Sequence, residues 1–202
     1  MISLSEIDTT VKRATKAIGF SWGIAEEVGK CIRSLEMFGL PGIKNLNQYY
    51  KVFANKKFQN VSLIAKSNIS KVSYCPIISG VNFLDQIHTL QNLEEIEFEN
   101  FGFPILFIPF LSRSSEIIGK RIFLKIDDKE LLLNFNQSIF SNYLSKKVIE
   151  NGNRIKISFI ENKDSFTSQD WQELYKLSEK TFVEETDELK IKTAGAGLTD
   201  ND

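Results

Sequence analysis

The stretch FSWGIAEEVGKCIRSLEMFGLPG, residues 20–42, decides the fold of the N-terminal part of this chain. Apolar residues recur in it three and four positions apart, as they do in a helix that buries one face. These residues are Ala25, Val28, Ile32 and Leu35. Ser21 suits the cap that starts such a helix, and Gly39 with Pro41 suits its end. The sequence therefore predicts a largely buried helix between Ser21 and Gly39.

One further helix is predicted on each side of this stretch. Ser3 opens a capping pattern ahead of an apolar stripe that stops at Gly19, which indicates a first helix. A proline suited to a first helical turn indicates a third helix, from residue 41 or 42 to about Asn55. Because the connections between the three helices are short, we expect residues 1–55 to form one helical layer.

Strand patterns dominate residues 56–192. Residues 121–126 and 130–135 alternate apolar and polar side chains around a short turn, which predicts an antiparallel hairpin. Residues 154–160 alternate in the same way after a turn signal at residues 151–153, so they are expected in the same sheet. Weaker strand signals lie at residues 61–65, 69–75, 95–98 and 189–192.

Short helices are predicted between these strands. One helix begins with Asn82 as its cap. Another has Pro109 in its first turn and buries Phe110 and Ile117. A last helix is predicted from a capping pattern formed by Asp170 and Glu173. The complete pattern predicts a single α+β domain over residues 1–202, in which an N-terminal three-helix layer packs on an antiparallel or mixed β-sheet, with a Gly-rich acidic tail at residues 193–202.

Composition excludes several classes of protein. The chain has 25 basic and 26 acidic side chains, so it lacks the basic surplus of a dedicated nucleic-acid binder. Its two cysteines, Cys31 and Cys75, are far apart, which favours a reduced, cytoplasmic protein over a disulfide scaffold. No apolar run has the length of a membrane span, and we expect no contact with a membrane.

The start of the second helix is a candidate ligand site. Ser21, Trp22 and Gly23 lie where free N–H groups and the helix dipole favour an anion, and a glycine lets a ligand approach closely. Close helix packing is the alternative explanation for glycines here, and Trp22 is equally suited to anchoring the helix on the core. Glu26 and Glu27 are candidate catalytic acids or bases. Adjacent helical residues point about 100° apart, so only one of the two glutamates would face a pocket.

The C-terminal tail is a second candidate. Gly195 and Gly197 permit tight turns and are candidate ligand-binding residues. Asp200 and Asp202 offer hard oxygen ligands of the kind that Mg²⁺ or Ca²⁺ prefers, so they are candidate metal ligands. The alternative is a frayed, solvated terminus.

Three other residues have reactive side chains without a supporting motif. His88, the only histidine, has no serine, cysteine or metal motif near it in sequence, so a structural role is the alternative to general base catalysis. Cys31 is expected to be buried in the apolar stripe. Cys75, which precedes a proline, is expected to be the more exposed thiol.

Two stretches together resemble a known family. LSEIDTTVKRATKAIGFSWGIAEEVGKCIRSLEMFGLPG and the closing AGAGLTDND are similar to an uncharacterised bacterial family that is grouped only as a domain of unknown function. The marks are SWGxAEE followed by LPG, and GAGAGLTDND, in which Thr193 replaces a glycine here. The resemblance implies that both ends of the chain matter, and it names no reaction and no cofactor.

Three functional hypotheses follow. The leading one is a small-molecule binding or accessory protein whose site lies between the start of the second helix and the C-terminal tail. The first alternative is a metal-assisted hydrolase or lyase that acts on a small polar metabolite. The second is an interaction protein that forms a homo-oligomer or docks its tail into a partner subunit.

Overall fold

A computed structural model describes most of the chain and divides it into two compact units. The units are Met1–Asn162 and Lys163–Asp202. The described residues are 2–134, 136, 138–143 and 145–181.

The described residues form an α+β fold, as the sequence predicts. The α-helices are α1 (Leu4–Ala17), α2 (Trp22–Met37), α3 (Gly42–Phe53), α4 (Pro76–Leu90), α5 (Ile108–Ile118) and α6 (Ser168–Glu179), and a 3₁₀ helix, η1 (Pro104–Phe107), precedes α5. The strands are β1 (Ser67–Asn68), β2 (Glu95–Gly102), β3 (Arg121–Ile126), β4 (Lys129–Leu133), β5 (Ile139–Ser141) and β6 (Asn151–Ile160). The predicted boundaries of α1, α2, α3 and the β3–β4 hairpin are confirmed to within a few residues.

The strands form one mixed sheet. Its order is β1-β2-β6-β3-β4-β5, with β1 parallel to β2 and all other neighbours antiparallel. The long strand β6 lies between β2 and β3, so it joins the two halves of the sheet. In the hairpin, Ile122 lies opposite Leu133 and Leu124 opposite Leu131, which places the apolar side chains of both strands on one face.

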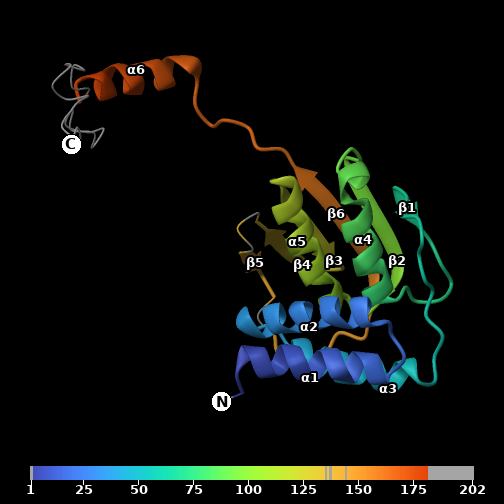
Figure 1. Cartoon of the computed structure of the whole chain (residues 1–202). Helices are drawn as coiled ribbons and strands as arrows, with labels where there is room; N and C mark the ends of the chain where they lie inside the picture. Colours follow the sequence, from blue (N-terminus) through green and yellow to red (C-terminus); the bar gives the residue numbers. More distant parts are fainter. Residues whose placement is uncertain (1, 135, 137, 144, 182–202) are drawn as a thin grey trace, which may run out of the picture. The chain divides into compact units, whose positions relative to one another are not determined.

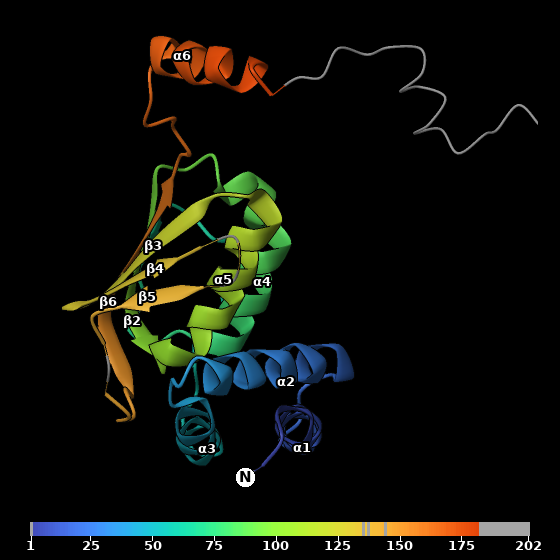
Figure 2. The ribbon, with the colours of Figure 1, turned by 90° about the vertical axis from the view of Figure 1, so that its left-hand side faces the viewer.

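Helices α4 and α5 cover one face of this sheet (Figure 2). The strands turn alternate residues toward these helices, and the inward ones, such as Ile155 and Ile157, are fully buried. The opposite face carries charged pairs, including Lys156 with Glu95 and Arg154 with Glu97. A large part of the core therefore lies between the sheet and the α4–α5 pair.

The three N-terminal helices form a separate layer beyond the ends of α4 and α5 (Figure 1). The buried face of α2 includes Val28, Ile32 and Leu35, as the apolar spacing predicts. Helix α1 approaches α2 closely at Gly29, where a β-carbon would lie 2.5 Å from Asp8 Oδ1. Helix α2 is thus held between α1 and the ends of α4 and α5.

Helix α4 begins earlier than the sequence predicts. Its N-cap is Cys75, whose sulfur accepts a hydrogen bond from the Ile78 N–H at 3.5 Å. The prediction of Asn82 as the cap is therefore wrong. Asn82 lies inside α4 and donates to the Val61 carbonyl at 2.5 Å, so it fixes the connection that precedes the helix.

Strand β6 is also longer than predicted. The turn predicted at residues 151–153 is wrong, because these residues extend the strand, and Asn151 and Gly152 pair with the end of β2. Gly152 lies opposite Phe101 in this pairing. A turn-like sequence is thus held in the sheet by a distant strand.

Smaller differences concern burial and caps. Ile117 is 49% exposed, so its predicted burial is wrong, whereas Phe110 is buried as expected. The cap of α6 is Thr167, with Asp170 as the reciprocal partner. Strand β5 has no counterpart in the prediction. The strand predicted at residues 189–192 lies outside the described residues.

Candidate functional site

The start of α2 is exposed and open. The Ser21 hydroxyl accepts a hydrogen bond from the Ile24 N–H at 3.4 Å, as expected of a cap. Trp22 is half exposed rather than anchored in the core, and Lys16 Nζ lies 5.7 Å from the centre of its ring. No atom lies within 4 Å of the position of a β-carbon on Gly23. Gly23 is therefore not required for packing.

Glu26 takes part in a surface ion pair. Its carboxylate accepts a hydrogen bond from Lys12 Nζ of α1 at 2.6 Å, and its side chain is 50% exposed. This hydrogen bond lowers the pKa of Glu26. Glu26 therefore links α1 to α2 at the surface.

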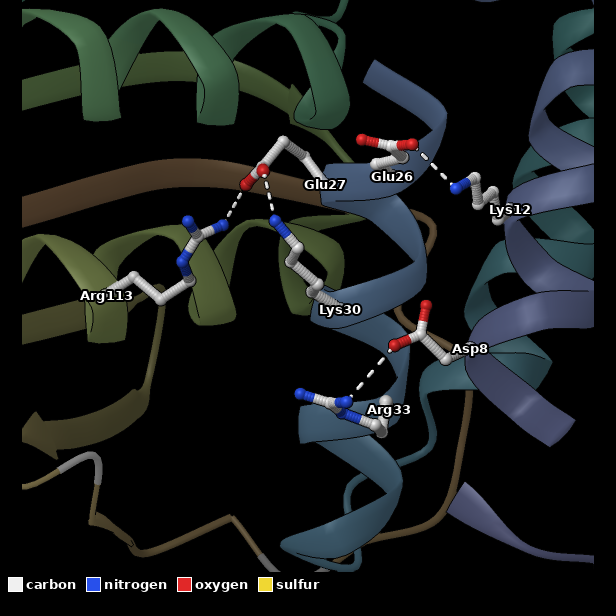
Figure 3. Close-up of polar contacts among 7 residues, drawn as sticks. All are labelled: Asp8, Lys12, Glu26, Glu27, Lys30, Arg33 and Arg113. Atoms are coloured by element: carbon white, nitrogen blue, oxygen red, sulfur yellow. Dashed lines mark hydrogen bonds and ion pairs between the residues drawn. The ribbon is translucent and has the colours of Figure 1, made fainter. Parts of the chain in front are cut away.

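Glu27 points to the other side of α2, toward α5 (Figure 3). It accepts hydrogen bonds from Arg113 of α5 and from Lys30 Nζ, the latter at 2.9 Å. Partial burial raises the pKa of Glu27, but the hydrogen bonds from Arg113 and Lys30 outweigh burial, and the pKa lies below its ordinary value of 4.5. Glu27 is thus held as a carboxylate that joins two helices.

Asp8 of α1 forms an ion pair with Arg33, the next basic residue of α2 after Lys30. Arg33 Nη1 lies 3.2 Å from Asp8 Oδ2 of α1. Asp8 is also the residue that α1 brings against Gly29, so the close approach of the two helices positions this ion pair. Charged residues of α1, α2 and α5 therefore form a group of separate ion pairs, in which Glu26 and Arg33 of α2 meet α1 and Glu27 meets α5.

A pocket of about 410 Å³ lies beside this group, bounded by α1, α2 and α5. We call it the α2–α5 pocket. It is lined by Leu4, Ser5, Lys30, Arg33, Ser34, Met37, Arg113 and Glu116. Three cationic residues and one acidic residue give this lining a formal charge of +2 (three positive charges less one negative charge). The carboxylates of Asp8 and Glu27, which pair with the cations, are not part of the lining.

The structure separates the two predicted catalytic glutamates. Glu26 faces α1 and Glu27 faces α5, in keeping with the angle between adjacent helical residues. Lys30, which lies four residues after Glu26, forms its ion pair with Glu27. Both glutamates have a lowered pKa, which makes each a weak general base at neutral pH.

The tail residues of the predicted site lie outside the described residues. They are Gly195, Gly197, Asp200 and Asp202. Within the residues that the structure describes, no group of three or more His, Cys, Asp or Glu side chains is placed to hold a metal ion.

Two cysteines and one histidine with reactive side chains lie outside the lining of this pocket. Cys31 is buried, as predicted, and burial raises the pKa of its thiol. Cys75 is only 1% exposed, so the prediction of an exposed thiol is wrong; its sulfur caps α4 and lies 3.2 Å from the Tyr49 hydroxyl. His88 lies on the exposed side of α4.

Arg113 is the residue of this pocket that the sequence could not indicate. It lies 86 positions from Glu27, and no motif surrounds it. Leu4 and Ser5 of α1 also line the pocket, and no sequence motif indicates a binding role for them. Only the packing of α5 against α2 brings these side chains together.

Comparison with known protein families finds a match over the N-terminal part of the chain. Residues 2–75 match the model of a family described as "Protein of unknown function (DUF3726)". This match confirms the resemblance to a domain of unknown function and contains the SWGxAEE and LPG marks. Comparison with curated proteins found no match, and comparison with solved structures found none either. In the described part of the chain, no helix has the length and apolar character needed to cross a membrane.

Proposed function

We propose that this protein binds a small anionic molecule in the α2–α5 pocket. The observation that carries the proposal is the positive lining: Lys30, Arg33 and Arg113 come from two helices and line one pocket with a single carboxylate among them. An anion that enters this pocket gains charge-assisted hydrogen bonds from several directions.

The lining favours a carboxylate or a phosphate group. A guanidinium has more N–H donors than one carboxylate can occupy, so Arg33 and Arg113 keep donors for a ligand while they pair with Asp8 and Glu27. Ser34 adds a hydroxyl to the same pocket. The volume of about 410 Å³ suits a metabolite rather than a polymer.

The neighbouring carboxylates have a positioning role in this proposal. Glu27 holds Arg113 and Lys30, and Asp8 holds Arg33, which reduces the side-chain freedom that a ligand would otherwise have to restrict. The same carboxylates compete with the ligand for these cations. We therefore expect moderate affinity, with dissociation constants in about the micromolar to millimolar range.

Thermal shift and titration calorimetry test the proposal directly. The purified chain is measured with inorganic phosphate, citrate and a phosphorylated sugar, each against sodium chloride at equal ionic strength. We expect at least one anion to raise the melting temperature by several degrees at saturation. Arg33→Ala should remove this shift, because it deletes a pocket cation whose side chain is 49% exposed and adds little to stability.

The matched control is Arg154→Ala. Arg154 is also an exposed arginine in an ion pair, with Glu97, but it lies on the open face of the sheet. This variant should keep the shift given by the anion. If no anion stabilises the chain beyond the sodium chloride reference, or if Arg33→Ala and Arg154→Ala behave alike, the proposal is wrong.

The role predicted for the C-terminal tail in ligand binding is tested by truncation. A chain that ends at residue 192 lacks Gly195, Gly197, Asp200 and Asp202, and weaker anion binding by this chain would support a role for the tail.

The metal-assisted alternative is tested by thermal shift across divalent metals, with a variant that carries both Asp200→Ala and Asp202→Ala. Cell fractionation tests the predicted cytoplasmic location.

A further inference from the structure

The cationic and apolar residues of the α2–α5 pocket lie toward opposite ends of it. Four of the lining residues belong to α2, and their spacing of three and four positions places them along one side of the helix. They are Lys30, Arg33, Ser34 and Met37. The row therefore runs from two cations past a hydroxyl to an apolar side chain, over about 10 Å at the rise of an α-helix.

Arg113 belongs to the cationic end of the pocket. Arg113 and Lys30 both donate hydrogen bonds to the carboxylate of Glu27, so the charged ends of their side chains lie close together. Figure 3 shows Lys30 and Arg33 extending from α2 on the side of Arg113. An anionic group at this end would thus meet cations from both α2 and α5.

Leu4 belongs to the apolar end of the pocket. Helices α1 and α2 run antiparallel, as the ion pairs between them show, and Asp8 of α1 pairs with Arg33 of α2. Leu4 lies one turn before Asp8. Met37 lies one turn after Arg33, so the two apolar side chains lie at the same end. Leu4 and Met37 are 40% and 55% exposed, and a ligand can therefore cover apolar surface there.

We propose that the α2–α5 pocket takes an anion that carries a short apolar chain. This inference rests on the proposed function and names the class of anion that the pocket selects. The carboxylate or phosphate group lies between Lys30 and Arg113, and the chain follows α2 and ends against Leu4 and Met37. A span of about 10 Å corresponds to an extended chain of about six to eight carbons.

The apolar end gives such a ligand an advantage over a bare anion. Each methylene that leaves water adds to the affinity, whereas acetate or inorganic phosphate reaches only the cationic end. The thioether of Met37 is flexible and adapts to apolar groups of different shape. The affinity should therefore increase with chain length until the chain extends beyond Met37.

Titration calorimetry with two series of anions tests the inference. One series is acetate, butyrate, hexanoate and octanoate, and the other is inorganic phosphate and hexyl phosphate, all as sodium salts at equal ionic strength. We expect the affinity to rise about twofold to fourfold for each added methylene up to hexanoate. The stronger of hexanoate and hexyl phosphate identifies the anionic group that the cationic end prefers.

Two variants separate the ends of the pocket. Met37→Gln makes the apolar end polar, so it should weaken hexanoate binding about threefold to tenfold and leave the binding of inorganic phosphate unchanged. Arg33→Ala should weaken the binding of both anions. The control is Leu63→Gln, which changes an apolar side chain that is 78% exposed outside the pocket and should alter neither affinity. Because Met37 is also exposed, Met37→Gln should melt as the unmodified chain does.

The results distinguish this inference from the proposed function. If acetate or phosphate binds and added methylenes do not raise the affinity, the apolar chain is wrong while the anion site remains. If no anion of either series binds, both proposals are wrong. If Arg33→Ala leaves hexanoate binding unchanged, or if Met37→Gln and Leu63→Gln behave alike, the chain binds outside the α2–α5 pocket and this inference is overturned.

Discussion

Glu26 and Glu27 are adjacent in sequence, but their surroundings differ. Glu26 is half exposed, and Lys12, with which it forms an ion pair, is partly exposed as well. Glu27 is 25% exposed and accepts hydrogen bonds from Arg113 and Lys30, which come from two helices. Exposed pairs contribute little to stability, whereas removal of one partner from a partly buried pair leaves the other charge uncompensated. Glu27 should therefore matter more for folding.

Glu27→Gln should lower the free energy of unfolding by about 1–3 kcal/mol at neutral pH, because it removes the charged acceptor between α2 and α5. The pKa of Glu27 is lowered in the folded state, so its stabilising effect is present above the ordinary value of 4.5 and is lost as pH falls through the folded pKa. The difference between the unmodified chain and Glu27→Gln should thus be largest above the ordinary pKa of 4.5 and shrink as the pH falls below that value. Urea unfolding across this pH range measures it.

Glu26→Gln is the matched control for this experiment. It makes the same chemical change one residue earlier, in the exposed pair with Lys12. We expect little or no change in the free energy of unfolding at neutral pH. Equal effects at the two positions would contradict the assignment of Glu27 as the acidic residue that joins the helices.

Two glycines of α2 give opposite predictions. Gly29→Ala would place a β-carbon 2.5 Å from Asp8 Oδ1 and 2.9 Å from its carbonyl oxygen, so α1 and α2 must move apart, at a cost of about 1–3 kcal/mol. Gly23→Ala meets no atom within 4 Å and should stabilise the chain by about 0.5 kcal/mol through helix propensity. Thermal unfolding of both variants checks this contrast. Destabilisation by both changes would argue against close packing as the reason for Gly29.

Local spacing in the sequence predicts some residue roles in α1 and α2 and not others. The apolar face of α2 and the caps of α1 and α2 follow from local spacing, and the structure confirms them. The partners of Glu27 and Arg33 do not follow, because Arg113 comes from a distant helix and Asp8 from a neighbouring one. Helical geometry alone could show that Glu26 and Glu27 diverge, but it could not show which cation each would meet.

At the scale of elements, α4 and α5 are brought together by small residues. A β-carbon on Gly80 would lie 2.2 Å from the Phe110 ring, so the ring occupies the space that the glycine leaves. Ser79 and Ser112 are buried, and their hydroxyl oxygens have no hydrogen-bond partner among the described residues. This close packing places the helix pair on the sheet and carries Arg113 to the α2–α5 pocket.

Gly80→Ala should destabilise the chain by about 2–4 kcal/mol, because the Phe110 ring is fully buried and cannot move aside without displacing α5. Ser112→Ala removes a buried hydroxyl on the same helix pair and should be neutral or stabilising by up to about 1 kcal/mol. Chemical unfolding measures both variants. Tolerance of Gly80→Ala would mean that α4 and α5 can separate easily.

Non-local pairing explains the elements that the sequence predicted wrongly. Residues 151–153 have the composition of a turn, yet they extend β6, where Asn151 pairs with Gly102 and Gly152 with Phe101 of β2. Asn82 has the residue type of a cap, yet its amide binds the Val61 carbonyl from within α4. Local composition cannot show these partners, whereas the β3–β4 hairpin, whose strands adjoin in sequence, was predicted well.

At the scale of the whole molecule, burial is distributed unevenly along the chain. Every buried residue of the hydrophobic core among the described residues lies between Ile7 and Ile157. Each described residue from 161 to 181 is exposed. The unit Met1–Asn162 thus contains a complete core, with β6 in the middle of its sheet.

A chain that ends at Asn162 should therefore fold on its own, with a melting temperature within about 3 °C of the full chain. It keeps all of β6 and the hydrogen bond from the Asn162 amide to the Gly119 carbonyl, at 2.8 Å. A chain that ends at residue 149 is the control, because it loses β6, leaves β2 and β3 without their shared neighbour and should not fold. Circular dichroism and calorimetry measure all three chains. A large loss of stability on removal of residues 163–202 would show that the second unit is required for the fold of the first, against the independent core described for residues 1–162.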